Sequence, residues 1–402
     1  MRQYNLLIFL LFFQLNVFSQ EKLTREKVEE YTKYFNLNSE GKIEGETADF
    51  LKKKADENQF IGIGEIHQSQ QLSYFTAAFL ELIKEKGYKN FALEIGTYSA
   101  DKLEEISKKS SKTFEELKKL NRKYGKSKFP YVPFIFVDKI ADAKFIEKAS
   151  ELKYNLWGID REYEFSYLIH LDELYSRVKN KTSEITKAYE KARKKIAKIN
   201  FKLKVSGESK YCWMINEPMM KEFFSLIDSD QELARYIREM KNSWSIYCRF
   251  VRGKGGSNAR ARYMRRKFDS LYSEAKKVDE IPKVLVKLGG VHLTHGKSIF
   301  GRYDVGNHLH DKAKENKTGF LAIRHMWRYK NGSDQSKKKN YEGTRFLLSL
   351  GKKDQWTLID LRPLKKLWMD KKIIVDKGTE WELKSYDLFL ISPDDTKGKV
   401  NR

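Results

Sequence analysis

Two short histidine motifs hold the residues whose types could do chemistry. The motif "GEIH" places Glu65 two residues before His67, and the motif "GGVH" ends on His292. A neutral imidazole beside a carboxylate can take a proton from water, and the carboxylate can orient the ring and stabilise the imidazolium. Two histidines with carboxylates can equally hold a divalent metal ion that acidifies water. The residue types alone leave both kinds of chemistry open.

The candidate residues share one position in the chain, at or just after the end of a predicted strand. Glu65 and His67 follow residues 60–64, Glu94 lies in 90–95, Asp160 ends 154–160, and His292 and His295 follow 283–290. The carboxyl ends of parallel strands lie on one edge of a sheet, where α/β proteins bind their ligands. We therefore expect these side chains to converge on a single site.

The elements around these motifs predict an α/β fold. A strand at 60–64, a helix at 70–86 with apolar residues at helical spacing, and a strand at 90–95 form a βαβ rhythm. From about residue 164 to 278 the pattern is helical and highly charged, and strands return from 283 onward. We expect a mixed, mostly parallel sheet flanked by helices, with a large helical insertion that forms a cap.

The order of these patterns predicts how the chain is organised. The expected parts are a signal peptide (1–19), an N-terminal helical segment (20–57), the first half of the α/β core (58–163), the helical cap (164–278) and the second half of the core (279–395). Arg2, the apolar run Leu6–Phe13 and the small residue Ser19 are typical of a secretory signal, and the run is too short to span a bilayer. We therefore expect an exported, periplasmic or secreted protein, with no transmembrane segment after cleavage. Cys212 and Cys248, the two cysteines, could pair there or stay buried thiols.

The chain is strongly basic. Its formal net charge is +24, or +23 without Arg2, and much of the excess lies in 181–204 and 249–268. Export argues against a nucleic-acid partner, so we expect a small-molecule substrate and favour an anionic one. Arg260 and Arg262 lie in the second basic stretch and could bind or polarise that substrate.

Several motifs resemble, in order, those of erythromycin esterase-like proteins: "GEIHQSQQ", "ALE", "WGID", "RARYM", "VHLTH" and "IDLR", over roughly residues 58–392. That family belongs to a superfamily with the haem-binding ChaN-like and the TraB/Tiki proteins. The resemblance implies an α/β fold with a helical cap and a hydrolytic site in which His67 activates water. In Tiki-type members, paired G-x-x-H motifs and a glutamate hold a metal, and the matching residues here are His67, His292 and Glu94.

The sequence also departs from the esterase pattern. "GEIH" is one residue shorter than the esterase motif, and Arg260-Ala261 replaces an Arg-Asp pair, which argues against a macrolide substrate. We expect an exported hydrolase of an ester-like or related bond. The candidate residues are Glu65, His67, Glu94 and His292 for catalysis, and Asp160, Arg260, Arg262 and His295 for substrate binding. The alternatives are a haem- or metal-binding ChaN-like protein and a Tiki-type metal-dependent peptidase.

Overall fold

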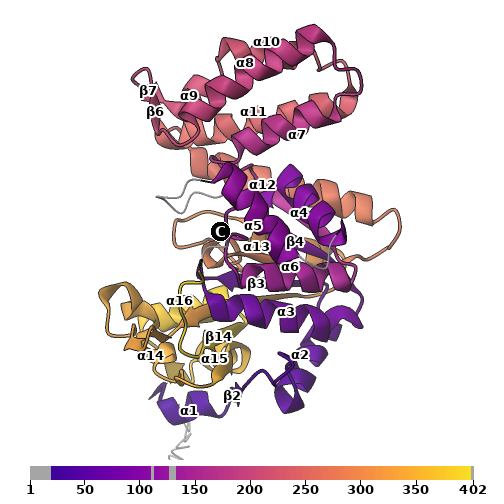
Figure 1. The fold of residues 1–402 in the computed structure, drawn as a ribbon. Coiled ribbons are helices and arrows are strands. Elements are labelled where there is room, and N and C mark those ends of the chain that lie inside the picture. The colour runs from indigo at the N-terminus through magenta and orange to yellow at the C-terminus, as the bar shows by residue number, and fades with distance from the viewer. Residues whose placement is uncertain (1–19, 110–112, 126–132, 400–402) are drawn as a thin grey trace, which may run out of the picture.

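The computed structural model of the chain describes residues 20–109, 113–125 and 133–399 (Figure 1). The expected signal peptide, residues 1–19, lies outside the described residues. Among the described helices, none combines the length and the apolar character that crossing a bilayer requires.

One mixed sheet forms the centre of the molecule. Its eight strands run in the order β2 (Thr32–Phe35), β12 (Trp356–Asp360), β14 (Leu388–Ser392), β9 (Phe320–Trp327), β3 (Phe60–Glu65), β8 (Lys283–Gly289), β4 (Tyr88–Gly96) and β5 (Asn155–Asp160). The six strands from β14 to β5 pair in parallel, and only β12 and β2 add antiparallel pairings. The predicted mixed, mostly parallel sheet is confirmed.

The order of the strands places the two histidine motifs side by side. β8 returns from the helical insertion and inserts between β3 and β4, which are consecutive strands in the sequence. In the register of β3 and β8, Glu65 pairs with Gly289. The sheet topology therefore positions the ends of "GEIH" and "GGVH" as neighbours, although more than two hundred residues separate them in the chain.

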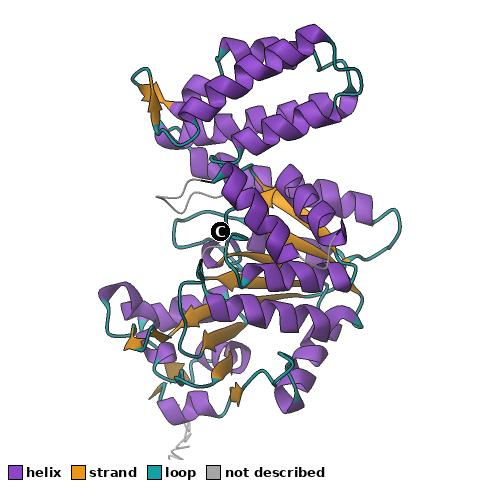
Figure 2. Cartoon of the chain, viewed as in Figure 1, coloured by secondary structure: helices purple, strands orange, loops and turns teal. Residues whose placement is uncertain are grey.

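Helices cover both faces of the sheet, as Figure 2 shows. One face is buried by α2 (Gly45–Glu57), α3 (Gln70–Lys84), α4 (Thr97–Lys109), α5 (Thr113–Tyr124) and α6 (Asp142–Glu151). The other is buried by α12 (Gly256–Ala275), α13 (Val305–Glu315), α14 (Arg345–Leu348), α15 (Leu361–Met369) and α16 (Lys377–Ser385). In β3, Ile61 and Ile63 point to the first face and Phe60 to the second, as the alternation of strand side chains requires.

The N-terminal segment, expected to be helical, also contains a strand. α1 (Arg25–Glu29) and α2 are present, but β2 lies between them and forms an edge of the main sheet by pairing with β12. The strand is only four residues long, and its buried Phe35 stacks on Trp356, with ring centroids 6.1 Å apart. A short edge strand between two amphipathic stretches leaves almost no periodic signal of its own.

The expected helical segment lies between β5 and β8 in the chain. It contains α7 (Tyr167–Arg177), α8 (Ser183–Ile199), α9 (Lys210–Met214), α10 (Pro218–Ser225), α11 (Gln231–Val251) and α12. The first part of this segment has an apolar core of its own, and α8 and α10 lie farthest from the sheet, at the top of Figure 1. α12 instead packs against β5. The division of the chain into separately folding parts stays a prediction.

A disulfide joins Cys212 of α9 to Cys248 of α11. Of the two possibilities open for the cysteines, the structure therefore has the paired one. The bond ties two helices of the insertion together across 36 residues of chain.

We expect replacement of both cysteines by serine to lower the stability of the helical segment by about 2–4 kcal/mol, because the unfolded chain regains the freedom that the cross-link removes. Thermal unfolding of the non-reduced protein and of the double variant measures this. Identical unfolding curves would show that the disulfide contributes nothing to stability.

Candidate active site

His67 is held by a carboxylate at the end of the central strand. Glu65 ends β3, and its Oε1 lies 2.9 Å from Nδ1 of His67. The second carboxylate oxygen of Glu65 binds Nζ of Lys287, which is buried in the neighbouring strand β8. One face of the imidazole stacks on Phe136, with ring centroids 4.0 Å apart. The ring is thus fixed from two sides, and with Nδ1–H donating to Glu65, Nε2 is left as the acceptor.

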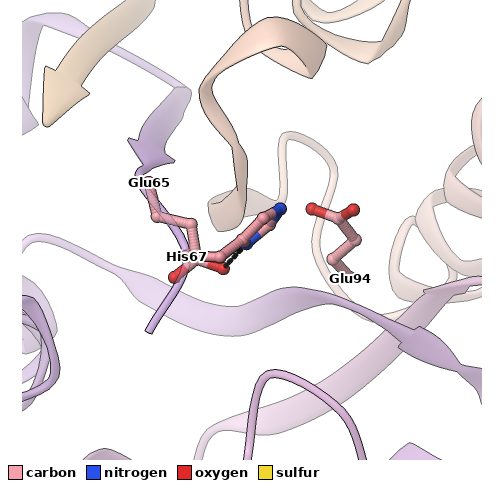
Figure 3. A group of neighbouring side chains, drawn as sticks. All are labelled: Glu65, His67 and Glu94. Carbon is pink, nitrogen blue, oxygen red and sulfur yellow. Dashed lines mark hydrogen bonds and ion pairs between the residues drawn. The ribbon is translucent and has the colours of Figure 1, made fainter. Parts of the chain in front are cut away.

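Glu94 lies on the other side of the His67 ring. Figure 3 shows the imidazole between the carboxylates of Glu65 and Glu94, with one ring nitrogen toward each. Each of the three residues has one atom that could bind a metal ion, and these three atoms lie within 4.8 Å of one another. We call Glu65, His67 and Glu94 the cluster. Oε2 of Glu94 accepts a 2.5 Å hydrogen bond from the backbone N–H of Gly289.

Arg260 links Glu94 to the end of β5. Its guanidinium donates to both oxygens of Asp160 and, through Nη2, to Oε1 of Glu94 at 2.5 Å. Nη1 lies 3.4 Å from Nε2 of His292, whose Nδ1 lies 2.9 Å from Oδ2 of Asp304. His292 thus faces a carboxylate at Nδ1, and its Nε2 faces both the Arg260 guanidinium and, at 3.7 Å, Oε1 of Glu94.

The glycines of the two motifs serve close approach rather than a sharp turn. Gly64, Gly289 and Gly290 all lack a positive φ. A Cβ on Gly64 would lie 3.0 Å from Cα of Gly290, so the backbones of β3 and β8 meet there. A Cβ on Gly289 would lie 3.0 Å from Nε2 of His67 and 3.3 Å from Oε2 of Glu94. The absence of a side chain at Gly289 therefore lets the ring of His67 and the carboxylate of Glu94 lie close against its backbone.

The electrostatics of the cluster keep both carboxylates ionised. Burial alone would raise the pKa of Glu65, but the charge of Lys287 and the hydrogen bond from His67 lower it to about 2. Burial opposes ionisation of Glu94 too, and Arg260, with His292 and His67, lowers its pKa to about 2. Burial lowers the pKa of His67, but the hydrogen bond and charge of Glu65 and the charge of Glu94 outweigh it, so the net shift is upward from 6.5.

A cavity of about 200 Å³ opens beside this cluster. Glu94 and Gly96 of β4, Asp160 and Arg161 at the end of β5, and Arg260 of α12 form its polar wall. Aromatic side chains form much of the remainder: Phe134, Phe136, Tyr163 and Tyr247. Tyr247 and Arg260 come from the α11–α12 end of the helical segment, so this end borders the site while α8 and α10 lie away from it.

The carboxylates do not fit a divalent metal ion in this arrangement. Glu65 already binds Lys287, and Glu94 binds Arg260. A divalent ion bound by these carboxylates would compete with Lys287 and Arg260 for the same oxygens. It would also lie next to these two positive charges, which would repel it.

The expected third ligand, His292, does not complete a metal site either. Among the described residues, the group whose possible ligand atoms lie close enough together to share a metal ion is Glu65, His67 and Glu94. His292 is not part of it. Nε2 of His292 is directed instead at the guanidinium of Arg260, 3.4 Å away. The cavity beside Glu94, about 200 Å³, is smaller than the roughly 300–1,000 Å³ of sites for drug-sized ligands.

Two residues expected at the site lie elsewhere. Arg262 lines a separate cleft between α11 and α12, together with Arg249 and Arg266. His295 binds Asp387 at 2.6 Å and packs against Phe320, which begins β9, so it lies toward the opposite end of the strands.

Sequence reasoning missed four residues that shape the site: Phe136, Arg161, Lys287 and Asp304. Lys287 carried a usable signal, because a lysine inside the apolar run "KVLVKLGG" must find a buried anion. Arg161 directly follows Asp160 and could have been included by the same strand-end rule. Phe136 and Asp304 reach the site from loops, and no local pattern marks them.

Gly289→Ala should displace His67 and Glu94, because the added Cβ would lie 3.0 Å from the ring of His67 and 3.3 Å from Oε2 of Glu94. We expect a loss of about 10–10²-fold in any turnover that depends on His67, because a displaced group loses its alignment with the reacting atoms. The backbone of Gly289 has φ −52° and ψ 137°, which alanine adopts readily, so the protein should fold. Steady-state kinetics of this variant beside Gly296→Ala, whose Cβ meets nothing within 4 Å, is the test. Equal activity of the two variants would show that the close approach of His67 and Glu94 to Gly289 is not needed.

The fold is that of erythromycin esterase-like proteins. The chain is similar to a mutant of erythromycin esterase EreC in its open conformation, with 13% identity, a TM-score of 0.56, and coverage of 92% of this chain and 99% of that one. It is also similar to a protein from Bacillus cereus (14% identity, TM-score 0.56, 94% and 98% covered) and to a succinoglycan biosynthesis protein (14% identity, TM-score 0.56, 93% and 97% covered). No family model matches the chain, and no curated protein matches it significantly. The resemblance expected from the motifs is thus confirmed at the level of the fold.

Proposed function

We propose that the protein is an exported hydrolase that cleaves an ester-like or related bond with water activated by His67. One observation carries this proposal. The hydrogen bond between Glu65 and Nδ1 of His67 leaves Nε2 as the acceptor, directed toward Glu94 on a side chain that is partly exposed. A base held by a carboxylate at one nitrogen, with the other nitrogen left to accept a proton, is the arrangement that general-base catalysis requires.

In the proposed reaction, a water molecule hydrogen-bonded to Nε2 of His67 gives its proton to this nitrogen as its oxygen attacks the substrate carbonyl carbon. Glu65 keeps the ring in the Nδ1–H tautomer and stabilises the imidazolium that forms. His67 then returns the proton to the leaving oxygen as the bond to carbon breaks. Arg260, fixed by Asp160 and Glu94, supplies the positive charge nearest to the cluster on the cavity side.

An ester panel with and without chelator tests the proposal. We expect the purified protein to hydrolyse at least one aryl or alkyl ester and to keep that activity after dialysis against EDTA. Activity that is lost with chelator and restored by Mn²⁺, Co²⁺ or Zn²⁺ would favour the metal-dependent peptidase alternative. A Soret band after purification with haem would favour the haem-binding alternative.

Export is supported by the signal-like sequence and by the disulfide. Disulfides persist in oxidising compartments and are rare in the cytosol. Expression of the full chain with N-terminal sequencing of the product checks this part of the proposal, with cleavage expected near Ser19. A product found only in the cytoplasm with residues 1–19 retained would contradict it.

A further inference from the structure

The arginine that follows Asp160 has two guanidinium nitrogens without a hydrogen-bond partner among the described residues. Arg161 lines the cavity beside the cluster, next to Glu164 and Tyr247. Its Nε and Nη1 are buried, and neither has a hydrogen-bond partner among the described residues. The nearest carboxylate oxygen, Oδ1 of Asp160, is 3.6 Å from Nη1, beyond hydrogen-bond reach, and Asp160 already accepts hydrogen bonds from Arg260.

The guanidinium of Arg161 is nevertheless held in a defined place. Its Cζ lies 4.0 Å from the centre of the Tyr247 ring, so the aromatic face orients the planar guanidinium, whose N–H groups form a fork of donors. Tyr247 is itself fixed, because it stacks on Tyr211 at 4.9 Å and precedes Cys248 of the disulfide. A fork that is oriented before binding loses little conformational freedom when it meets an oxyanion.

A buried N–H donor without a hydrogen-bond acceptor is costly, and neither the ring of Tyr247 nor the oxygen of Asp160 at 3.6 Å replaces the hydrogen bonds that Nε and Nη1 would make to water. The carboxyl group that lines the cavity beside it, Glu164, does not resolve this. Its Oε2 has no hydrogen-bond partner among the described residues, and burial raises its pKa, against the opposing charges of Lys210 and Arg161. The feature that would satisfy Arg161 is a ligand oxyanion placed in the cavity.

We propose that Arg161 is a specificity-determining residue that binds an anionic group of the substrate, a carboxylate or a phosphate, while the scissile bond lies at His67. This inference rests on the proposed function and adds the substrate class to it. A guanidinium presents paired N–H donors that match the oxygens of either anion. The reacting carbonyl and the anion would lie in the same molecule, with the anion at Arg161 and the carbonyl at His67.

Binding measured on an inactive protein tests the inference separately from the hydrolysis. Isothermal titration calorimetry on the His67→Gln protein compares three probes: monomethyl glutarate, 2-acetoxyethyl phosphate and the neutral dimethyl glutarate. We expect at least one anionic ester to bind at least tenfold more tightly than the neutral one. The first two probes decide between a carboxylate and a phosphate.

In the same background, Arg161→Gln should weaken binding of the preferred anionic ester by about 10–100-fold, the usual range for lost charge-assisted hydrogen bonds. Arg161→Lys should recover part of the loss, since it keeps the charge without the fork. Arg262→Gln is the matched control and should change nothing, because this arginine lines another cleft. Equal affinity for charged and neutral esters, or no change on Arg161→Gln, would overturn the inference.

Kinetics in the active protein add a second readout. Arg161→Gln should raise KM for the anionic ester with little change in kcat, and leave the neutral ester unaffected. If the wild-type protein hydrolyses no ester while the binding preference persists, the proposed function fails and the assignment of Arg161 stands. If Arg161→Gln does not fold, the comparison is made with Arg161→Lys, and an unchanged KM and affinity there would reject the role of the fork.

Discussion

Replacement of His67 by glutamine is expected to lower the turnover of an ester substrate by about 10²–10⁴-fold, the range for losing a general base. Glutamine keeps the approximate size of the side chain and can still hydrogen-bond Glu65, but it cannot accept a proton from water at neutral pH. The side chain of His67 is 39% exposed, so its loss should cost little folding stability. The measurement is kcat for wild type and variant on the best ester of the panel.

The matched control for this change is His295→Gln. That histidine is also paired with a carboxylate, Asp387, but lies toward the opposite end of the strands. It should keep full activity if turnover depends on the cluster at the carboxyl ends. A folded His67→Gln protein with wild-type activity would leave His67 as a residue kept for packing against Phe136.

Replacement of Glu65 by glutamine is expected to have an effect as large, about 10⁴-fold in kcat. That is the loss seen when the carboxylate of a serine-protease triad becomes an amide and the histidine is held in the wrong tautomer. The amide N–H₂ of glutamine would donate to Nδ1 of His67 and move the ring proton to Nε2, the nitrogen that must accept from water. The pKa of His67 should fall at the same time, because the hydrogen bond and charge of Glu65 raise it.

A stability effect must be separated from this catalytic effect. Glu65→Gln leaves Lys287 buried without its anion, and breaking a buried pair costs about 3–5 kcal/mol. The double variant Glu65→Gln, Lys287→Met removes the orphaned charge and should recover much of the lost stability while remaining inactive. Recovery of activity together with stability would show that Glu65 serves the fold and not the reaction.

Much of the site could be predicted because position in an α/β fold constrains function. The strand-end rule predicted that Glu65, His67, Glu94, Asp160 and His292 would converge, and the structure brings them together at one edge of the sheet. The same rule also included His295, which binds Asp387 away from this site. What the rule could not supply is the pairing inside the cluster. Asp160 was expected to bind substrate, but its two oxygens bind Arg260.

The two arginines of "RARYM" show that residue type alone does not predict which side chain reaches the site. Arg260 reaches the cluster and Arg262 does not, although both lie in α12. Residues two apart on a helix point about 200° apart, so they cannot serve the same site. The helical period could therefore have predicted that only one of the two arginines reaches the site, but not which of them does.

The pH dependence of kcat/KM on the best ester is the most direct test of the account. Because Glu65 and Glu94 raise the pKa of His67 above 6.5, and only the neutral ring can accept a proton, kcat/KM should fall as the pH drops through that value. We predict a single acid limb with a pKa above 6.5 in the wild-type protein and its absence from the residual activity of His67→Gln. A profile that is flat from pH 5 to 8, or the same acid limb in both proteins, would contradict the central role of His67.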